Sequence, residues 1–571
     1  MIGGALLAES LSRLGIRNVF TLHGGHLDPF LIGCNDLGIR LIDTRHEATA
    51  GHAAEVAGML EPGAVGVCAI TAGPGLTNAL TAMASAYVNG LPVVYIAGAP
   101  PLREVETNEL QGGFVQLQMA LPVTKWAHRV TIGDRIPDLL EKAIRIASSG
   151  RPGPVLLEVP IDVMFREVPR VLFPIADERM APSRPSPSVE AAREFLGALA
   201  SAERPIIVCG TGCVTSGAGV AIDQFSRHTG IPVVTNSKAH GLLPGDHPYY
   251  CGPAGTLAAL TMTGGPTPDL IVLAGARAGL LLGGRSGSII PKAARLLQID
   301  IEASEIGRMS PVENALVADC AEAFKLFNQL TPELAWSRSQ EWRSALANVR
   351  SMDPFTAAPS ECASGRIHPH HAARAVFEAI GSNATVVVDG GEMTAWCEPL
   401  NRASRPGAYL TAGYLGTLGF GPGYAIGAAV ARPEAPVFLL AGDGAIGFHL
   451  QEFDTMARHH LPIVTVIMNN ACWAMSKNGQ DLVFGEGRRV VVELADRAYE
   501  DVSKALGGAG ERVERLEDIG PAIARAAASG GPACINIATD GDVVHPITFG
   551  MAGADPTKGK LAMPYYQNET P

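Results

Sequence analysis

The sequence predicts an α/β protein with three doubly wound parallel-sheet domains and a carboxyl-terminal tail. Strand patterns alternate with helical patterns along the chain, and proline-rich or polar stretches interrupt that alternation twice. The 571 residues also exceed what a single hydrophobic core normally organises. We therefore expect domains over residues 1–172, 188–335 and 366–545, with a tail over 546–571.

Composition indicates a well-buried enzyme of the cytoplasm. Hydrophobic residues make up 47% of the chain and charged residues 18%. The net charge of −12 argues against a nucleic-acid partner, because phosphate backbones select basic surfaces. The ten cysteines are scattered, as in a reduced cytoplasmic protein. No apolar run reaches about 18 residues and the start lacks a secretory pattern, so we expect neither a membrane span nor a signal peptide.

The first two domains are predicted from buried strands followed by helices. In the first, the strands are NVFTLHGG, LIDT, GVCAIT, LPVVYIAG and GPVLLEVPIDV, and HEATAGHAAEVAGML is a helix. The stretch at 173–190 has the composition of a linker. In the second, the strands are RPIIVCGTG, IPVVTN, PDLIVLAGA and RLLQIDIE. Both blocks predict parallel sheets covered by helices.

The third domain carries the most specific motif of the chain. Its strands are ATVVVDGGE, APVFLLAGDG, LPIVTVIMNN and PACINIAT. Asp443 in GDG and Asn470 in NN follow two successive strands, so both are expected at the carboxyl edge of one sheet. A carboxylate and an amide oxygen there can share a hard cation such as Mg²⁺, which favours oxygen ligands and substrate phosphates. GDG alone would equally suit a tight strand-to-helix turn, but GDG followed by NN after one strand resembles the signature of thiamine-diphosphate enzymes.

With these motifs, the whole chain resembles the acetolactate synthase/pyruvate decarboxylase superfamily of thiamine-diphosphate enzymes. The resemblance implies a pyrimidine-binding first domain, a central Rossmann-like domain and a diphosphate-binding third domain. It also implies a homodimer or homotetramer whose active sites are shared between subunits. By the same resemblance, Mg²⁺ is held by Asp443, Asn470 and the main-chain carbonyl of Cys472.

The resemblance also assigns residues around the cofactor. Glu47, after a strand and at the start of a helix, is the carboxyl that promotes the imino tautomer of the aminopyrimidine and so the deprotonation of the thiazolium carbon. A helix-terminal acid favoured by the dipole is the alternative for Glu47 taken alone. The other implied cofactor contacts are Asn78 in TAGPGLTN, Gly391, Glu392 and Met393 in DGGEMTAW, Gly416 and Leu418 in GYLGTLG, and Gly442, Gly444 and Ala445.

Within the superfamily, the chain is most similar to benzaldehyde lyase and 2-hydroxyacyl-CoA lyase. LHGGHLD, ETNELQGG and PVTKWAHRV carry this similarity. It implies that His26 and Gln111 hydrogen-bond the hydroxyl and carbonyl of a 2-hydroxy ketone. Two positions depart from benzaldehyde lyase, because Ala412 and Thr394 stand where that enzyme has histidine and tyrosine. These differences put specificity for aromatic acyloins in doubt.

Two further segments bear on the substrate. In 2-hydroxyacyl-CoA lyases, a glutamate on a short helix relays a proton between the substrate hydroxyl and the cleaved carbon, and Glu493 in ELADRAYE fits that description. A solvent-facing helical glutamate is the alternative. The tail, with Lys558, Lys560, Tyr565 and Tyr566, is either a lid like those of acyl-CoA relatives or a frayed terminus.

The central domain leaves its ligand open. Arg277 in AGARAGLLLGG and Asp300 in QIDIE suit ADP or the ADP moiety of CoA, but a ligand-free domain that holds the fold together is preferred to one that binds FAD. HPHH at 368–371 is interpreted as a helix start rather than a metal site.

Together these features predict a thiamine-diphosphate- and Mg²⁺-dependent 2-hydroxyacyl-CoA lyase. It would release formyl-CoA and an aldehyde or ketone, and could run the condensation in reverse. The alternatives are a benzaldehyde-lyase-like enzyme acting on free acyloins and an acetolactate synthase, with a non-catalytic relative disfavoured by intact Glu47, Asp443 and Asn470.

Overall fold

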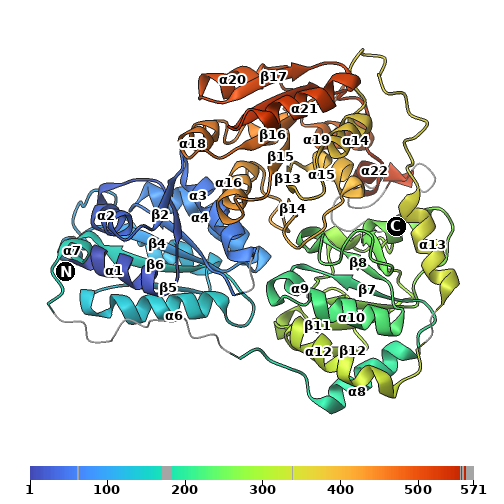
Figure 1. Cartoon of the computed structure of the whole chain (residues 1–571), viewed down its shortest axis with the longest axis horizontal. Coiled ribbons are helices and arrows are strands. Elements are labelled where there is room, and N and C mark those ends of the chain that lie inside the picture. The colour runs from blue at the N-terminus through green and yellow to red at the C-terminus, as the bar shows by residue number, and fades with distance from the viewer. Residues whose placement is uncertain (61–62, 170–182, 337–338, 553, 556–558, 561–571) are drawn as a thin grey trace.

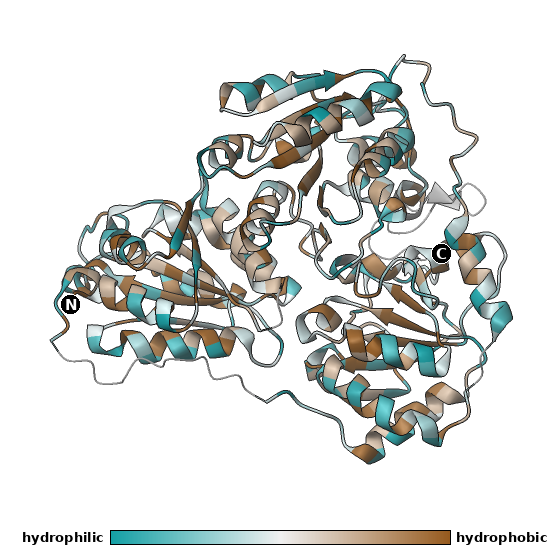
Figure 2. Ribbon diagram, viewed as in Figure 1, coloured by the Kyte–Doolittle hydropathy of each residue, from teal (hydrophilic) through white to brown (hydrophobic). Residues whose placement is uncertain are grey.

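The computed structural model has three α/β lobes, each built on its own six-stranded parallel sheet (Figure 1). It describes residues 1–60, 63–169, 183–336, 339–552, 554–555 and 559–560. Most of the strands are largely brown in Figure 2, whereas the outer faces of the covering helices are largely teal. This is the layering expected of buried parallel sheets, and it confirms the predicted fold class.

The first sheet has the strand order β2-β1-β3-β4-β6-β5. Its central strands are buried from end to end, as Gly66–Ile70 and Val93–Ala99 illustrate. The strands are β1 Asn18–Thr21, β2 Arg40–Asp43, β3 Gly66–Ile70, β4 Val93–Ala99, β5 Trp126–Arg129 and β6 Val155–Pro160. The helices are α1 Gly3–Arg13, α2 Asp28–Asp36, α3 Glu47–Met59, α4 Pro74–Asn89, α5 Gln116–Ala120, α6 Ile136–Ser148 and α7 Ile161–Phe165.

The central sheet has the order β12-β11-β10-β7-β8-β9, which is the Rossmann order read from one edge. The strand order reverses between β7 and β10, where such folds form a crevice. The strands are β7 Pro205–Cys209, β8 Val233–Thr235, β9 Tyr250–Pro253, β10 Leu270–Ala274, β11 Arg295–Asp300 and β12 Asn314–Val317. The helices are α8 Val189–Ala200, α9 Thr211–Ser216, α10 Gly219–Thr229, α11 Gly255–Met262, α12 Cys320–Leu330 and α13 Gln340–Ser351.

The third sheet, β14-β13-β15-β16-β18-β17, repeats the strand order of the first. The strands are β13 Thr385–Asp389, β14 Tyr409–Thr411, β15 Val437–Gly442, β16 Ile463–Asn469, β17 Ala509–Val513 and β18 Ala533–Ala538. The helices are α14 Pro369–Ala379, α15 Gly391–Cys397, α16 Gly421–Ala431, α17 Asp443–Ile446, α18 Glu452–Arg458, α19 Ala474–Phe484, α20 Tyr499–Ala505, α21 Ile519–Ala528 and α22 Pro546–Ala552. A short antiparallel pair follows, β19 Ala554–Asp555 and β20 Gly559–Lys560.

Helices α3 and α16 join the first and third domains (Figure 1). A Cβ added at Gly423 would lie 2.8 Å from the Thr49 carbonyl oxygen, and one at Gly427 would lie 2.4 Å from the Ala53 carbonyl oxygen. The two glycines therefore let the helix backbones approach closely. One hydrophobic core runs through this contact, including Ala53, Met83 and Tyr424.

His368 caps the start of α14, as the interpretation of HPHH required, because its Nδ1 accepts a hydrogen bond from the His370 backbone N–H. Among the described residues, no group of three or more His, Cys, Asp or Glu side chains is arranged to hold a metal ion. Within that same part of the chain, we find no helix long and apolar enough to cross a membrane.

Candidate active site

The third domain gathers its predicted site residues at the carboxyl ends of neighbouring strands. Asp443 directly follows β15, and Asn470 follows β16, the adjacent strand. Gly391 begins α15, shortly after β13, and Gly416 lies in the loop after β14. Four separate stretches of sequence thus meet at one edge of one sheet, as expected for a parallel fold.

Asp443 has the properties expected of a cation ligand. Its side chain is 2% exposed; Oδ1 accepts a hydrogen bond from the Gly444 backbone N–H at 3.0 Å, whereas Oδ2 has none. Burial raises the pKa of Asp443 to about 6. A buried carboxylate oxygen without a donor is costly, and a bound cation would remove that cost. The donor set beside it, carboxylate and amide oxygens, is the type that Mg²⁺ prefers.

The turn after β16 brings Asn470 beside Asp443's strand end. Asn470 Oδ1 accepts a hydrogen bond from the Cys472 backbone N–H at 3.2 Å, and Ala471 has a left-handed backbone with φ 56°. The next residues pair with the segment at 491–494, since the Trp473 N–H donates to the Val492 carbonyl at 2.8 Å. This pairing fixes the turn that carries two of the predicted metal ligands.

Two of the glycines at this edge leave open space beside the backbone. A Cβ added at Gly442 would meet no atom within 4 Å, and Gly416 is equally open, with φ 67°. Gly444 is different, because its Cβ would lie 2.5 Å from the Trp473 ring. Backbone N–H groups in such an open, glycine-lined turn suit a phosphate. Ala445 is buried behind them.

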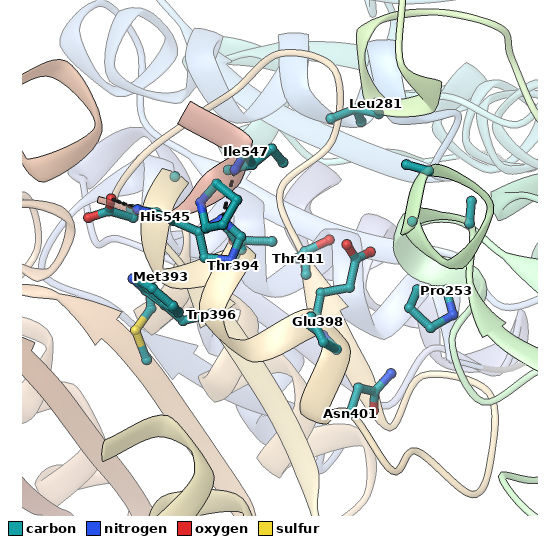
Figure 3. A pocket seen from close by; sticks show the side chains of 18 of the residues that line it. Pro253, Leu281, Met393, Thr394, Trp396, Glu398, Asn401, Thr411, His545 and Ile547 are labelled. Carbon is teal, nitrogen blue, oxygen red and sulfur yellow. Dashed lines mark hydrogen bonds between the residues drawn. The ribbon is translucent and has the colours of Figure 1, made fainter. Parts of the chain in front are cut away.

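These residues line a cavity of about 2160 Å³ between the third and central domains (Figure 3). The third domain contributes Asp443, Asn470 and Glu392 to the lining; the Glu392 carboxyl is 8% exposed, and burial raises its pKa to about 7. Glu392 accepts a hydrogen bond from Asn478 Nδ2 at 3.2 Å. The central domain contributes Arg285 and Lys292, two exposed cations on one of its loops. Met393, Gly416, Leu418 and Ala412 also line it.

In Figure 3, Pro253 and Leu281 of the central domain face Thr411, Glu398 and Thr394 of the third across this cavity. The cavity is also lined by His545, which lies just before the carboxyl-terminal tail, and by Ile547, near the start of that tail. Burial lowers the pKa of His545 to about 4, so this imidazole is neutral near pH 7. The chain beyond Lys560, with Tyr565 and Tyr566, lies outside the described residues, as does Lys558.

The first domain gathers a second set of polar side chains at its own sheet edge. Glu47 is 5% exposed at the start of α3, and its Oε2 accepts a hydrogen bond from Asn78 Nδ2 at 2.9 Å. His26 lies in the turn after β1, with Nδ1 3.4 Å from Thr71 Oγ1, and burial lowers its pKa. Gln111 has φ 60° and packs against Gly73.

The predicted site residues of the first domain and those of the third domain lie on different parts of the surface. Glu47, Asn78, His26 and Gln111 come from the first domain, whereas the described residues that line the large cavity all come from Asn236 onward. A single copy therefore does not bring the predicted glutamate to the cavity that contains Asp443.

Glu493 does not lie on a helix, contrary to the expectation. It forms an isolated antiparallel bridge with Cys472, it is exposed, and the next helix, α20, begins only at Tyr499. The apolar run before it lacks helical spacing and includes Val491, whose left-handed backbone has φ 57°. The pairing does, however, place Glu493 beside the predicted metal-binding turn.

Sequence reasoning missed the residues that join the domains around this site. Lys238 donates a hydrogen bond to the Thr411 carbonyl, and His240 contacts the Glu398 carboxylate at 2.9 Å. The large cavity and its cationic loop were also not predicted. A lysine between the apolar stretches IPVV and GLL was the available signal.

Comparisons with known proteins agree with these features. Models of the thiamine pyrophosphate enzyme N-terminal, central and C-terminal domains match residues 1–119, 192–327 and 389–537. A Mycobacterium tuberculosis protein named acetolactate synthase large subunit IlvG is 34% identical over 96% of this chain and 97% of its own. Proteins named 2-hydroxyacyl-CoA lyase 2 are 30% identical in Caenorhabditis elegans, over 90% of this chain and 84% of theirs, and 31% identical in Homo sapiens, over 89% and 84%.

The three matched models follow the order of the three observed domains, and the third one spans the strand ends that carry Asp443 and Asn470. The chain therefore belongs to the thiamine pyrophosphate enzyme family and is a thiamine-diphosphate-dependent enzyme.

Proposed function

We propose that the enzyme cleaves 2-hydroxyacyl-CoA thioesters to formyl-CoA and an aldehyde or ketone, and catalyses the reverse condensation. The observation that carries the proposal is the lining of the large cavity, which includes Asp443 of the third domain and Arg285 and Lys292 of the central domain. A CoA thioester has its reacting carbons far from an anionic nucleotide, so it suits a large cavity lined by the predicted cofactor residues and by cations of another domain. Cations of this kind suit phosphates.

Within this proposal, Asp443 Oδ2, the Asn470 side chain and the Cys472 carbonyl hold Mg²⁺. The orphaned oxygen of Asp443 supports this assignment. Bound thiamine diphosphate supplies the carbon nucleophile that attacks the substrate carbonyl. Gly442, Gly444 and Ala445 would hold the diphosphate, and two loops with Gly391, Glu392, Met393, Gly416 and Leu418 would hold the pyrimidine ring.

The protein side chains orient the substrate and move protons. Glu47 Oε exchanges a proton with the pyrimidine ring, and Asn78 holds that carboxyl in place through their hydrogen bond. His26 and Gln111 hydrogen-bond the substrate hydroxyl and carbonyl oxygens. Glu493 accepts the proton of the hydroxyl as the carbon–carbon bond breaks, and delivers it to the thioester carbon, which becomes the formyl carbon of formyl-CoA.

We further propose that two copies of the chain share each active site. Glu47 is absent from the cavity's described lining, so the partner's first domain has to supply it. Both surfaces concerned expose large apolar side chains, as an interface between copies requires. Near Gln111 these are Leu110, Phe114, Val115 and Met119; on the third domain they are Phe448, Phe484, Val490 and Val491. The assembly is a homodimer or a homotetramer built from it.

Two other activities would use the same cofactor. An acetolactate synthase is favoured by the 34% identity to the mycobacterial relative. A benzaldehyde-lyase-like enzyme would act on free acyloins and leave the cations of the cavity lining, Arg285 and Lys292, without a role. We prefer the CoA lyase because it uses both the predicted cofactor residues and these cations.

We propose a cytoplasmic location, which suits ten free cysteines.

Between the domains, Arg277 and Asp300 line a second cavity of about 250 Å³. This volume is smaller than the roughly 300–1,000 Å³ that is usual for ligand sites. Arg277 and Arg151 there already lie 3.9 and 3.7 Å from Glu305, so we assign no FAD to it and at most the ADP portion of a ligand.

The function is tested with a double variant, Arg285→Gln with Lys292→Gln, and two thioesters of the same 2-hydroxy acid. One carries CoA and the other pantetheine, which lacks the nucleotide. We expect the variant to raise KM about tenfold or more for the CoA thioester and to leave the pantetheine thioester unchanged. Equal effects on both substrates, or no turnover of either by the wild type alongside acetolactate formation from pyruvate, would overturn the proposal.

A further inference from the structure

A short segment of the central domain docks onto the end of β14 in the third domain. The 3₁₀ turn η5, Ser237–Ala239, places Lys238 Nζ 2.6 Å from the Thr411 carbonyl oxygen, and the two elements pack together. His240 contacts Glu398 just after it, and a Cβ at Gly241 would lie 2.1 Å from the Arg405 carbonyl. The segment is therefore fitted closely to the third domain.

Lys238 is an ammonium in the interior of the protein. Its side chain is 1% exposed, its Nζ lies 5.5 Å from the centre of the Tyr424 ring, and burial lowers its pKa to about 8. The Tyr424 hydroxyl donates in turn to Glu55 Oε2 of the first domain at 2.8 Å. Burying a charged side chain destabilises the fold, whereas burying an apolar side chain of the same size does not. A charge that is retained despite this cost indicates that the contacts of Lys238 have a function.

The loop that begins at Thr411 is held by all three domains. The Asn89 side chain, at the end of α4, packs so closely on Gly413 that a Cβ there would lie 1.6 Å from its oxygen. The Tyr414 hydroxyl donates to the Arg277 carbonyl at 2.9 Å, while Arg277 Nη2 donates to the Val88 carbonyl at 2.7 Å. Beyond these anchors, the loop continues to Gly416 and Leu418 on the cavity wall.

We propose that Lys238 is a positioning residue for the cofactor: it fixes the start of the loop at 411–418 so that the loop is preformed to receive the aminopyrimidine ring. The proposal rests on the cofactor contacts assigned to Gly416 and Leu418 above, but not on the identity of the substrate. It gives the central domain a function that requires no bound nucleotide. Preformed loops bind better because less conformational entropy is lost on binding.

The test compares Lys238→Met with Lys125→Met. Lys125 is a matched control, because its Nζ also donates to backbone carbonyls, Ile146 at 2.5 Å and Ser149 at 2.6 Å, and burial likewise lowers its pKa to about 8. It lies in the first domain and does not line the large cavity. Thiamine diphosphate binding is measured by calorimetry with Mg²⁺, and amide hydrogen exchange is followed in peptides that cover the loop.

We expect Lys238→Met to raise the Kd for thiamine diphosphate at least about tenfold, because losing a hydrogen bond to a charged group changes an equilibrium constant by about that factor or more. Exchange of the loop amides should accelerate in the cofactor-free protein, whereas turnover at saturating cofactor should fall less than affinity. Lys125→Met should lower only the melting temperature. An unchanged Kd for Lys238→Met, or equal changes in both variants, would overturn the proposal.

If Lys238→Met does not fold, Lys238→Arg provides the measurement, because it keeps the charge but moves the donor. It should give the same faster exchange confined to the loop, and exchange that is uniform along the chain would contradict the inference. Wild-type protein that binds the cofactor but cleaves no thioester would refute the proposed function and leave this proposal standing.

Discussion

Replacing Asp443 with asparagine should stabilise the cofactor-free protein and abolish its response to metal and cofactor. The pKa of Asp443 rises from 3.8 to about 6 in the folded protein. At about 1.4 kcal/mol per pKa unit, the ionised carboxylate then destabilises the fold by up to about 3 kcal/mol above that pKa. Asparagine has the same shape without the charge, so Asp443→Asn should recover much of this free energy near neutral pH.

The pH dependence follows from the direction of this shift. The folded protein binds the Asp443 proton more tightly than the unfolded chain, so this residue makes the cofactor-free protein more stable as the pH falls from about 7 to about 4. Asp389 and Glu392, whose pKa values burial raises to about 7, act in the same sense. The difference in the free energy of unfolding between wild type and Asp443→Asn isolates the contribution of Asp443. This difference should vanish below about pH 4.

The assay is thermal unfolding with chelator, and again with Mg²⁺ and thiamine diphosphate. About 3 kcal/mol corresponds to several degrees in a domain of about 150–250 residues, so the variant should melt higher near neutral pH in chelator. Ligand at about 100 times its Kd should stabilise the wild type by about 2.7 kcal/mol and the variant far less. The exposed Asp246→Asn is the control and should change neither value. The reasoning would be refuted if Asp443→Asn melted at a lower temperature than the wild type in chelator, or if Mg²⁺ and cofactor stabilised it as much as the wild type.

Three further outcomes are expected. Glu47→Gln keeps the contact with Asn78 but not the exchangeable carboxyl proton, so turnover should fall at least about 100-fold while calorimetry still detects Mg²⁺-dependent cofactor binding; normal turnover would exclude Glu47 from catalysis. Leu110→Asp places a charge on a side chain that is 84% exposed, so sedimentation should detect a shift to monomer together with loss of activity, and an active monomer would contradict the shared site. The purified protein should lack flavin absorbance, because Arg151 and Arg277 face Glu305 in a cavity of about 250 Å³; bound FAD would contradict this assignment.

The fold was predictable because its signals are local. Fully buried strands such as Val93–Ala99 and Ile463–Asn469 appear as continuous apolar runs, and short polar motifs mark where each run ends. Parallel pairing then brings Asp443 and Asn470 to one edge without knowledge of the packing. The assignment of these positions as ligands depends on the resemblance and on the orphaned oxygen of Asp443.

What the sequence did not predict depends on contacts between distant segments. Glu493 was expected on a helix, but pairing with Cys472 keeps its segment extended. Lys238 gave no motif, since its partners Thr411 and Tyr424 lie more than a hundred residues away and in another domain. The large cavity forms between two domains whose relative placement no local pattern encodes.

The most direct test of the central claim is the product formed from a short 2-hydroxyacyl-CoA by protein loaded with thiamine diphosphate and Mg²⁺. Mass spectrometry of the reaction should detect formyl-CoA and the matching aldehyde or ketone in equal amounts, with at least about 100-fold less formed by Glu47→Gln in the same time. Release of aldehyde from benzoin, or of acetolactate from pyruvate, with no formyl-CoA from the thioester, would contradict the account and assign the enzyme to another branch of its family.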